Sequence, residues 1–109
     1  MNVFFLPKVL VYLEDLVIIL YEKDYFGFLD SSERYVEDLV DDIKENLPIK
    51  QHKPAPKHFD KYGENLEYAI FRKNKNTQWY VFFRIYKKNG EEFYQVRYIA
   101  NNHTVAHYL

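Results

Sequence analysis

The chain has 109 residues and is 48% hydrophobic, so it is long enough to bury the core of one domain without disulfides or metal. It contains no cysteine, which excludes disulfides, thiolate nucleophiles and cysteine-based zinc sites, and favours a reducing, cytoplasmic location. The formal net charge of −1 combines −7 over residues 1–49 with +6 over residues 50–109. Two interpretations of this charge separation are open: the basic segment forms a face that binds an anion, or the two oppositely charged segments attract each other across the fold.

The N-terminal segment predicts a short strand and then a helix. Residues 2–5 read as the strand, and apolar residues recur at helical spacing over 7–22, with Pro7 suited to the first turn. Glu14 and Asp15 interrupt the apolar run, and neither a basic segment nor a cleavage site accompanies it. We therefore expect a buried core helix and neither an export signal nor a membrane span.

A second helix follows a turn over residues 24–29, in which Gly27 is the expected pivot. Asp30 is the candidate N-cap, and Glu33 lies three residues later, as in a capping box. Pro48 ends the helix. Its outward face is acidic, which is typical of a solvated helix surface.

Residues 48–63 are expected to form a basic loop. Pro54 and Pro56 favour an extended conformation, and Lys57 and Lys61 are among its cations. Loops on a rigid scaffold often carry function, so this loop either faces an anion or is merely solvated.

The C-terminal half predicts a strand meander. The three strands cover residues 66–73, 78–86 and 93–100. In the middle strand Trp79, Val81 and Phe83 alternate with more polar neighbours, which indicates two different faces. Asn89-Gly90 is a tight-hairpin signal, and residues 101–109 are expected to lie on the rim of the sheet. The predicted fold class is thus α+β: one domain over 1–109, with a short strand, a two-helix hairpin and a three- to four-stranded antiparallel sheet.

This order of elements resembles the RelE/ParE superfamily of bacterial toxins. The likeness is carried by residues 65–72 (Asn-Leu-Glu-Tyr-Ala-Ile-Phe-Arg), 79–85 (Trp-Tyr-Val-Phe-Phe-Arg-Ile), 93–102 and 105–108 (Val-Ala-His-Tyr). The resemblance implies a toxin that either cuts mRNA in the ribosome or acts on DNA gyrase. It also implies a cognate antitoxin peptide as partner.

RNA cleavage by this route requires a base, an acid and a positive charge to offset the phosphate. His107 and Tyr108 match the tail residues of some mRNA-cleaving members, and Arg84 on the middle strand could hold a phosphate. These three are the candidate catalytic residues. The candidate nucleic-acid-binding residues are Arg72, Lys73, Lys75, Arg97, His103, Lys57 and Lys61. No cofactor and no metal are expected, because the spacing of His103 and His107 binds metal only on a helix and no long helix is expected there.

Departures from the resemblance leave three hypotheses open. The RelE-type paired lysines are absent from residues 68–71, an expected arginine aligns with Tyr80, and residues 101–103 are Asn-Asn-His. The chain is therefore a ribosome-dependent mRNA endonuclease with a different charge set, a toxin that acts on gyrase without cutting RNA, or a module that only binds a partner protein.

Overall fold

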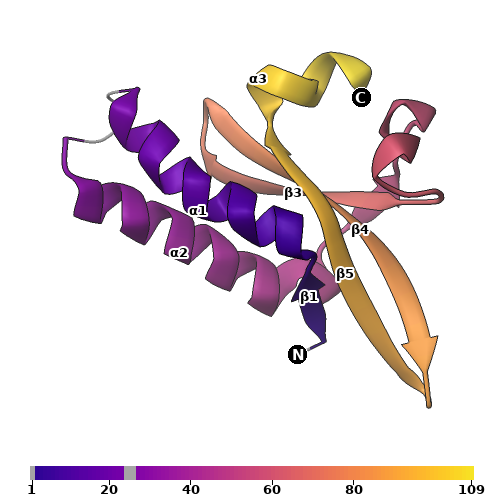
Figure 1. Ribbon diagram of the computed structural model, residues 1–109. Helices are drawn as coiled ribbons and strands as arrows, with labels where there is room; N and C mark the ends of the chain where they lie inside the picture. Colours follow the sequence, from indigo (N-terminus) through magenta and orange to yellow (C-terminus); the bar gives the residue numbers. More distant parts are fainter. Residues whose placement is uncertain (1, 24–26) are drawn as a thin grey trace.

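The computed structural model describes residues 2–23 and 27–109, and it confirms the predicted α+β class (Figure 1). Residues 24–26 of the predicted turn lie outside the described residues. With η denoting a short 3₁₀ helix, the elements are β1 (Val3–Phe5), α1 (Pro7–Glu22), α2 (Leu29–Asn46), η1 (Leu47–Ile49), β2 (His52–Pro54), η2 (Lys57–Tyr62), β3 (Glu67–Asn74), β4 (Thr77–Lys88), β5 (Glu91–Asn101), α3 (Asn102–Val105) and η3 (Ala106–Tyr108).

The sheet has five strands in the order β1-β5-β4-β3-β2. β1 pairs in parallel with β5, whereas the other neighbouring strands pair antiparallel. The expectation of a three- to four-stranded antiparallel sheet is therefore wrong both in strand number and in the direction of one edge. The two edge strands have three residues each. Strands so short carry too few side chains for an alternating pattern that would reveal their pairing.

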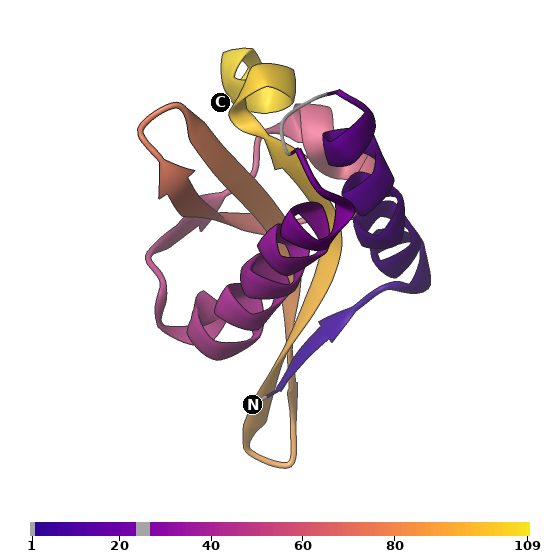
Figure 2. The ribbon, with the colours of Figure 1, turned by 90° about the vertical axis from the view of Figure 1, so that its left-hand side faces the viewer.

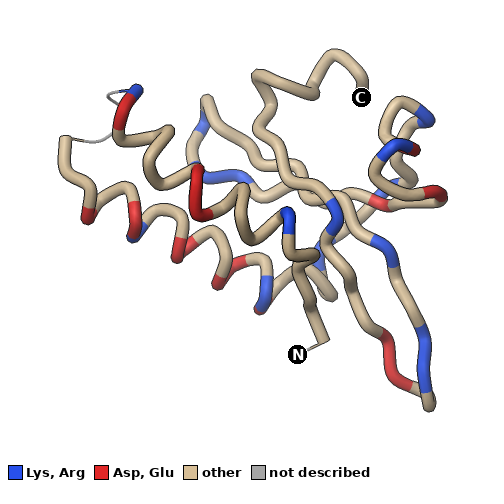
Figure 3. Tube along the Cα trace, in the orientation of Figure 1, with Lys and Arg blue, Asp and Glu red and all other residues tan. Residues whose placement is uncertain are grey.

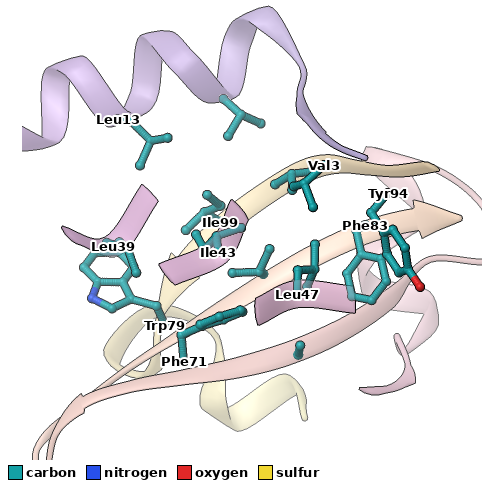
Figure 4. Packing of buried hydrophobic residues seen from close by; sticks show 14 of the residues in the cluster. Val3, Leu13, Leu39, Ile43, Leu47, Phe71, Trp79, Phe83, Tyr94 and Ile99 are labelled. Carbon is teal, nitrogen blue, oxygen red and sulfur yellow. The ribbon is translucent and has the colours of Figure 1, made fainter. Parts of the chain in front are cut away.

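Helices α1 and α2 form a layer over one face of the sheet (Figures 1 and 2). Their inward side chains pack on Trp79, Val81 and Phe83 of β4, as the alternation predicts (Figure 4). Trp79 Nε1 donates a hydrogen bond of 2.8 Å to the hydroxyl of Tyr35 on α2, so its polar atom is satisfied within the core.

The opposite face is covered at its centre by η2 and the C-terminal α3–η3 segment. Phe59 of η2 stacks on Phe82 of β4, with ring centroids 4.3 Å apart. Val105 of α3 belongs to the same second hydrophobic cluster. The sequence predicts a tail on the rim and an irregular basic loop. Instead, the tail forms short helices anchored by Val105, and the loop contains β2 and the helix η2, which Phe59 and the stack of Tyr62 on Tyr98 hold on the sheet.

Helix α2 begins two residues before the expected site. Its N-cap is Phe28, which makes no side-chain capping hydrogen bond, and Asp30 lies inside the first turn. The prediction of Asp30 as N-cap is therefore wrong. A carboxylate in the first turn still stabilises the helix through its dipole. At the other end, the α-helix stops at Asn46, and the chain continues through Pro48 as η1.

The β4–β5 hairpin extends beyond the helix layer (Figures 1 and 2). Its turn residues Asn89 and Gly90 have φ of 52° and 80°, as the Asn-Gly signal predicts for a two-residue hairpin turn. The register shifts opposite Phe82 and Phe83, which leaves Arg97 as an extra residue on β5.

Among the residues described, no helix has the length and apolar character needed to cross a membrane.

Candidate functional site

Two segments far apart in sequence bring His58, His107 and Tyr108 together. The ring of Tyr108 stacks on His58, with centroids 3.5 Å apart and an interplanar angle of 9°. The ring centroid of His107 lies 3.9 Å from that of Tyr108, at 41°. Tyr108 is 43% exposed, so the cluster is open to a ligand. We call these three residues the histidine–tyrosine cluster.

Local packing explains why the cluster forms. Pro56 precedes η2 in an extended conformation, and the buried side chain of Phe59 then fixes this helix on the sheet. On the other side, the Asn101 side chain accepts a hydrogen bond from the Thr104 amide and so caps α3. Val105 anchors the segment next to η2. The sequence therefore specifies two anchors, and the anchors bring the rings into contact.

The cluster lies in a positive environment. Partial desolvation, followed by the nearby charges of Lys61 and His107, lowers the pKa of His58 below its ordinary value of 6.5. Lys57 and Lys61 belong to the same helix as His58 and flank it in sequence. Near neutral pH, His58 is therefore an unprotonated base next to cations that could offset a phosphate.

Arg97 and Arg84 belong to a second group, on the same face of the sheet but farther along the hairpin. Arg97 donates hydrogen bonds to Gln95 Oε1 (3.0 Å), the Tyr62 carbonyl (3.2 Å) and the Tyr86 hydroxyl (3.2 Å). The guanidinium of Arg84 lies 5.2 Å from the Tyr86 ring centroid. The structure thus brings Arg84 to Arg97, but not to His107 and Tyr108.

The remaining predicted binding residues lie at the other end of the sheet. Arg72 is opposite Gln78 in the β3–β4 pairing, about 20 Å from Arg84 at about 3.4 Å per strand residue. The ammonium of Lys73 lies 5.2 Å from the ring centroid of Tyr35 on α2. Lys75 lies in the turn between β3 and β4, and His103 lines a cavity on the helix side. The seven candidates therefore do not form one surface.

The lysines and arginines of the basic half form no ion pair with a carboxylate among the described residues. Within residues 2–23 and 27–109, the only ion pair joins His52 and Glu67 at 2.7 Å. Figure 3 shows Lys and Arg along η2 and the β4–β5 hairpin, where Asp and Glu also occur, and it shows a row of Asp and Glu along α2. The attraction between the two halves is therefore not realised as direct ion pairs, and the cations can meet an external anion.

The described part of the chain holds no group of three or more His, Asp or Glu side chains that could bind a metal ion. Two residues of this face do not stand out in the sequence. In the sequence, His58 is one of several basic residues in a predicted loop, and Tyr86 is one of several residues on one face of a predicted strand. The alternation along β4 is the signal that would have placed Tyr86 with Arg84.

Comparison with known proteins provides no relative for this chain. No protein-family model matches it, and neither do any curated protein or solved structure. The functional argument therefore rests on the geometry of the histidine–tyrosine cluster and on the cations around it.

Proposed function

We propose that this chain is a RelE/ParE-like toxin that cleaves single-stranded RNA, with mRNA in the ribosome as its substrate. The observation that carries the proposal is the contact of His58 and His107 with Tyr108. Two imidazoles at one site supply both a base and an acid near neutral pH. The order of elements, with a strand, a helical hairpin, a meander and a short C-terminal segment, supports the likeness; β2 and η2 are additions between α2 and β3.

The reaction needs only protein groups and the RNA itself. Neutral His58 accepts the proton of the 2′-hydroxyl, whose oxygen attacks the adjacent phosphorus. The bond from phosphorus to the 5′-oxygen breaks, and protonated His107 donates the proton that the leaving oxygen requires. The products are a 2′,3′-cyclic phosphate and a 5′-hydroxyl. Lys57 and Lys61 offset the charge that develops on the phosphate oxygens, and Tyr108 orients the imidazole on which it stacks.

The test is cleavage of mRNA by the purified chain, with ribosomes in a buffer that contains Mg²⁺ and without ribosomes in the presence of EDTA. We expect His58→Ala and His107→Ala each to slow cleavage by about 10²–10⁴-fold, the usual contribution of a general acid or base. His52→Gln is the matched control, because His52 contacts Glu67 on the far side of β3 and lies outside the cluster. Cleavage that persists in both alanine variants would refute the proposal.

A non-catalytic toxin that acts on gyrase is the second candidate. It is favoured by one observation: both arginines of the hairpin are engaged around Tyr86, away from the histidine–tyrosine cluster. Growth arrest on expression, with intact mRNA and altered DNA supercoiling, would support this candidate. Arrest with mRNA ends that disappear in His107→Ala would support the nuclease.

An antitoxin peptide is the partner that the resemblance implies. A groove of about 480 Å³ between α1 and α2 suits such a peptide, because Leu10, Val17 and Val40 line it together with acidic side chains. The acidic residues around it are Glu14, Glu33, Glu37 and Asp41. A peptide with apolar residues flanked by Lys or Arg would complement this groove.

A further inference from the structure

The guanidinium of Arg97 is held rigidly but is not saturated. Its Nε and both terminal nitrogens each donate one hydrogen bond, to Gln95, Tyr62 and Tyr86. Arginine has five N–H donors, so one donor remains on each terminal nitrogen. Two such donors on the planar fork match the oxygens of a phosphate.

The neighbourhood of Arg97 is built from neutral acceptors. Its three partners are an amide oxygen, a backbone carbonyl and a phenol, and none of them neutralises the guanidinium. Arg84 adds a second positive charge, with its guanidinium over the Tyr86 ring at 5.2 Å from the centroid. Asp60 and Glu64 line the adjacent cavity with Lys8 and Lys61, but neither forms an ion pair with Arg97 among the described residues.

The Tyr86 hydroxyl connects the two arginines electrostatically. It donates to Gln95 Oε1 at 3.2 Å and accepts from Arg97 at 3.2 Å. The hydrogen bond from Arg97, with the charges of Arg97 and Arg84, lowers the pKa of Tyr86. Both guanidinium groups therefore act on the same phenol oxygen, in keeping with the hydrogen bond from Arg97 and the position of Arg84 over the ring.

Helix η2 connects this group to the histidine–tyrosine cluster. His58 lies near its start, and the carbonyl of Tyr62 at its end accepts a hydrogen bond from Arg97. At about 2.0 Å per residue of a 3₁₀ helix, these two positions are about 8 Å apart along the axis. A phosphate at Arg97 is therefore not the one that reacts at His58, but a neighbouring phosphate of the same strand.

We propose that Arg97, Arg84 and Tyr86 form a second phosphate-binding subsite, which holds the backbone of single-stranded RNA beside the phosphate that is cleaved. This inference rests on the proposed nuclease function and specifies its substrate. The RNA must extend as a single strand from the histidine–tyrosine cluster along the β4–β5 hairpin. The subsite binds substrate and takes no part in the bond-breaking step.

Binding can be measured without cleavage by using a labelled 2′-O-methyl oligoribonucleotide, which lacks the attacking hydroxyl. The measurement is fluorescence anisotropy of the full chain at several salt concentrations. We expect Arg97→Gln and Arg84→Gln each to weaken binding by about tenfold or more, as for loss of a hydrogen bond to a charged group. The slope of log K against log salt should become shallower by about 0.7 for each phosphate that the variant no longer neutralises.

Arg34→Gln is the matched control, because Arg34 is exposed on α2, on the other side of the sheet. It should leave affinity and salt slope unchanged. Since Arg97 also contacts the Tyr62 carbonyl, Arg97→Gln could disturb η2, and its fold is checked by circular dichroism. The side chain of Arg84 donates no hydrogen bond to the described residues, so Arg84→Gln tests the subsite if Arg97→Gln unfolds.

The two proposals fail separately. Wild-type affinity and salt slope in folded Arg84→Gln and Arg97→Gln would overturn the subsite, whether or not the chain cuts RNA. Absence of oligonucleotide binding by the unmodified chain would overturn it too. Binding that depends on both arginines, with unmodified RNA left intact, would support the subsite and refute only the nuclease.

Discussion

Replacing Phe59 by alanine tests whether one buried ring holds the functional face together. Phe59 is 1% exposed and stacks on Phe82, and it is the buried residue of η2, the helix that carries His58. We expect Phe59→Ala to destabilise the fold and to separate His58 from Tyr108. Cleavage or RNA binding that depends on the cluster should fall with it.

The magnitude follows from the burial of the ring. A buried aromatic side chain removes about 150–250 Å² from water. At about 25 cal/mol per Å² this gives about 4–6 kcal/mol, close to the roughly 3–5 kcal/mol that Phe→Ala substitutions typically cost. With an m-value of about 1–3 kcal/mol per M, the urea midpoint should fall by at least about 1 M.

The assay is equilibrium urea unfolding, followed by fluorescence and circular dichroism. Phe28→Ala is the matched control, because Phe28 is 75% exposed and should change the free energy of unfolding by less than about 0.5 kcal/mol. If Phe59→Ala does not fold, Phe59→Leu provides a milder change of up to about 1.5 kcal/mol. A midpoint shift in Phe59→Ala no larger than in Phe28→Ala would refute the argument that η2 is anchored by this ring.

Three further predictions concern single positions. Gly63→Ala should lower stability by about 1–3 kcal/mol in urea unfolding, because φ is +146° and a Cβ would lie 3.0 Å from Arg97 Cδ; wild-type stability would contradict this. Tyr86 should be an early-ionising tyrosine in an ultraviolet phenolate titration, with a pKa below the ordinary value of 10.0, and that phase should disappear in Tyr86→Phe but not in Tyr21→Phe. Because His58 must be unprotonated to act as base and its pKa is lowered, the acid-side decline of kcat/KM should be centred below pH 6.5; an acid-side decline centred above 6.5 would contradict this assignment.

Helices and strands that are long enough to show a repeating residue pattern can be predicted from the sequence alone. Helix α1 and strand β4 are long enough for several repeats of a 3.6- or two-residue period, so their extents and inward faces can be predicted. Asn89-Gly90 likewise specifies its turn locally, because these residue types tolerate positive φ. The identities of His107 and Tyr108 as candidate site residues came from the resemblance, and their roles stay predictions.

Packing between remote segments determines which residues meet. The parallel pairing of β1, the edge strand β2 and the short helix η2 depend on contacts with distant strands, and segments of three to six residues carry no period that predicts such contacts. The same holds for the site. His58 approaches Tyr108 because Phe59 and Val105 occupy neighbouring parts of one apolar surface, and Arg97 reaches Tyr86 because β5 pairs with β4. Local propensity cannot encode these proximities, because each depends on where another part of the chain packs.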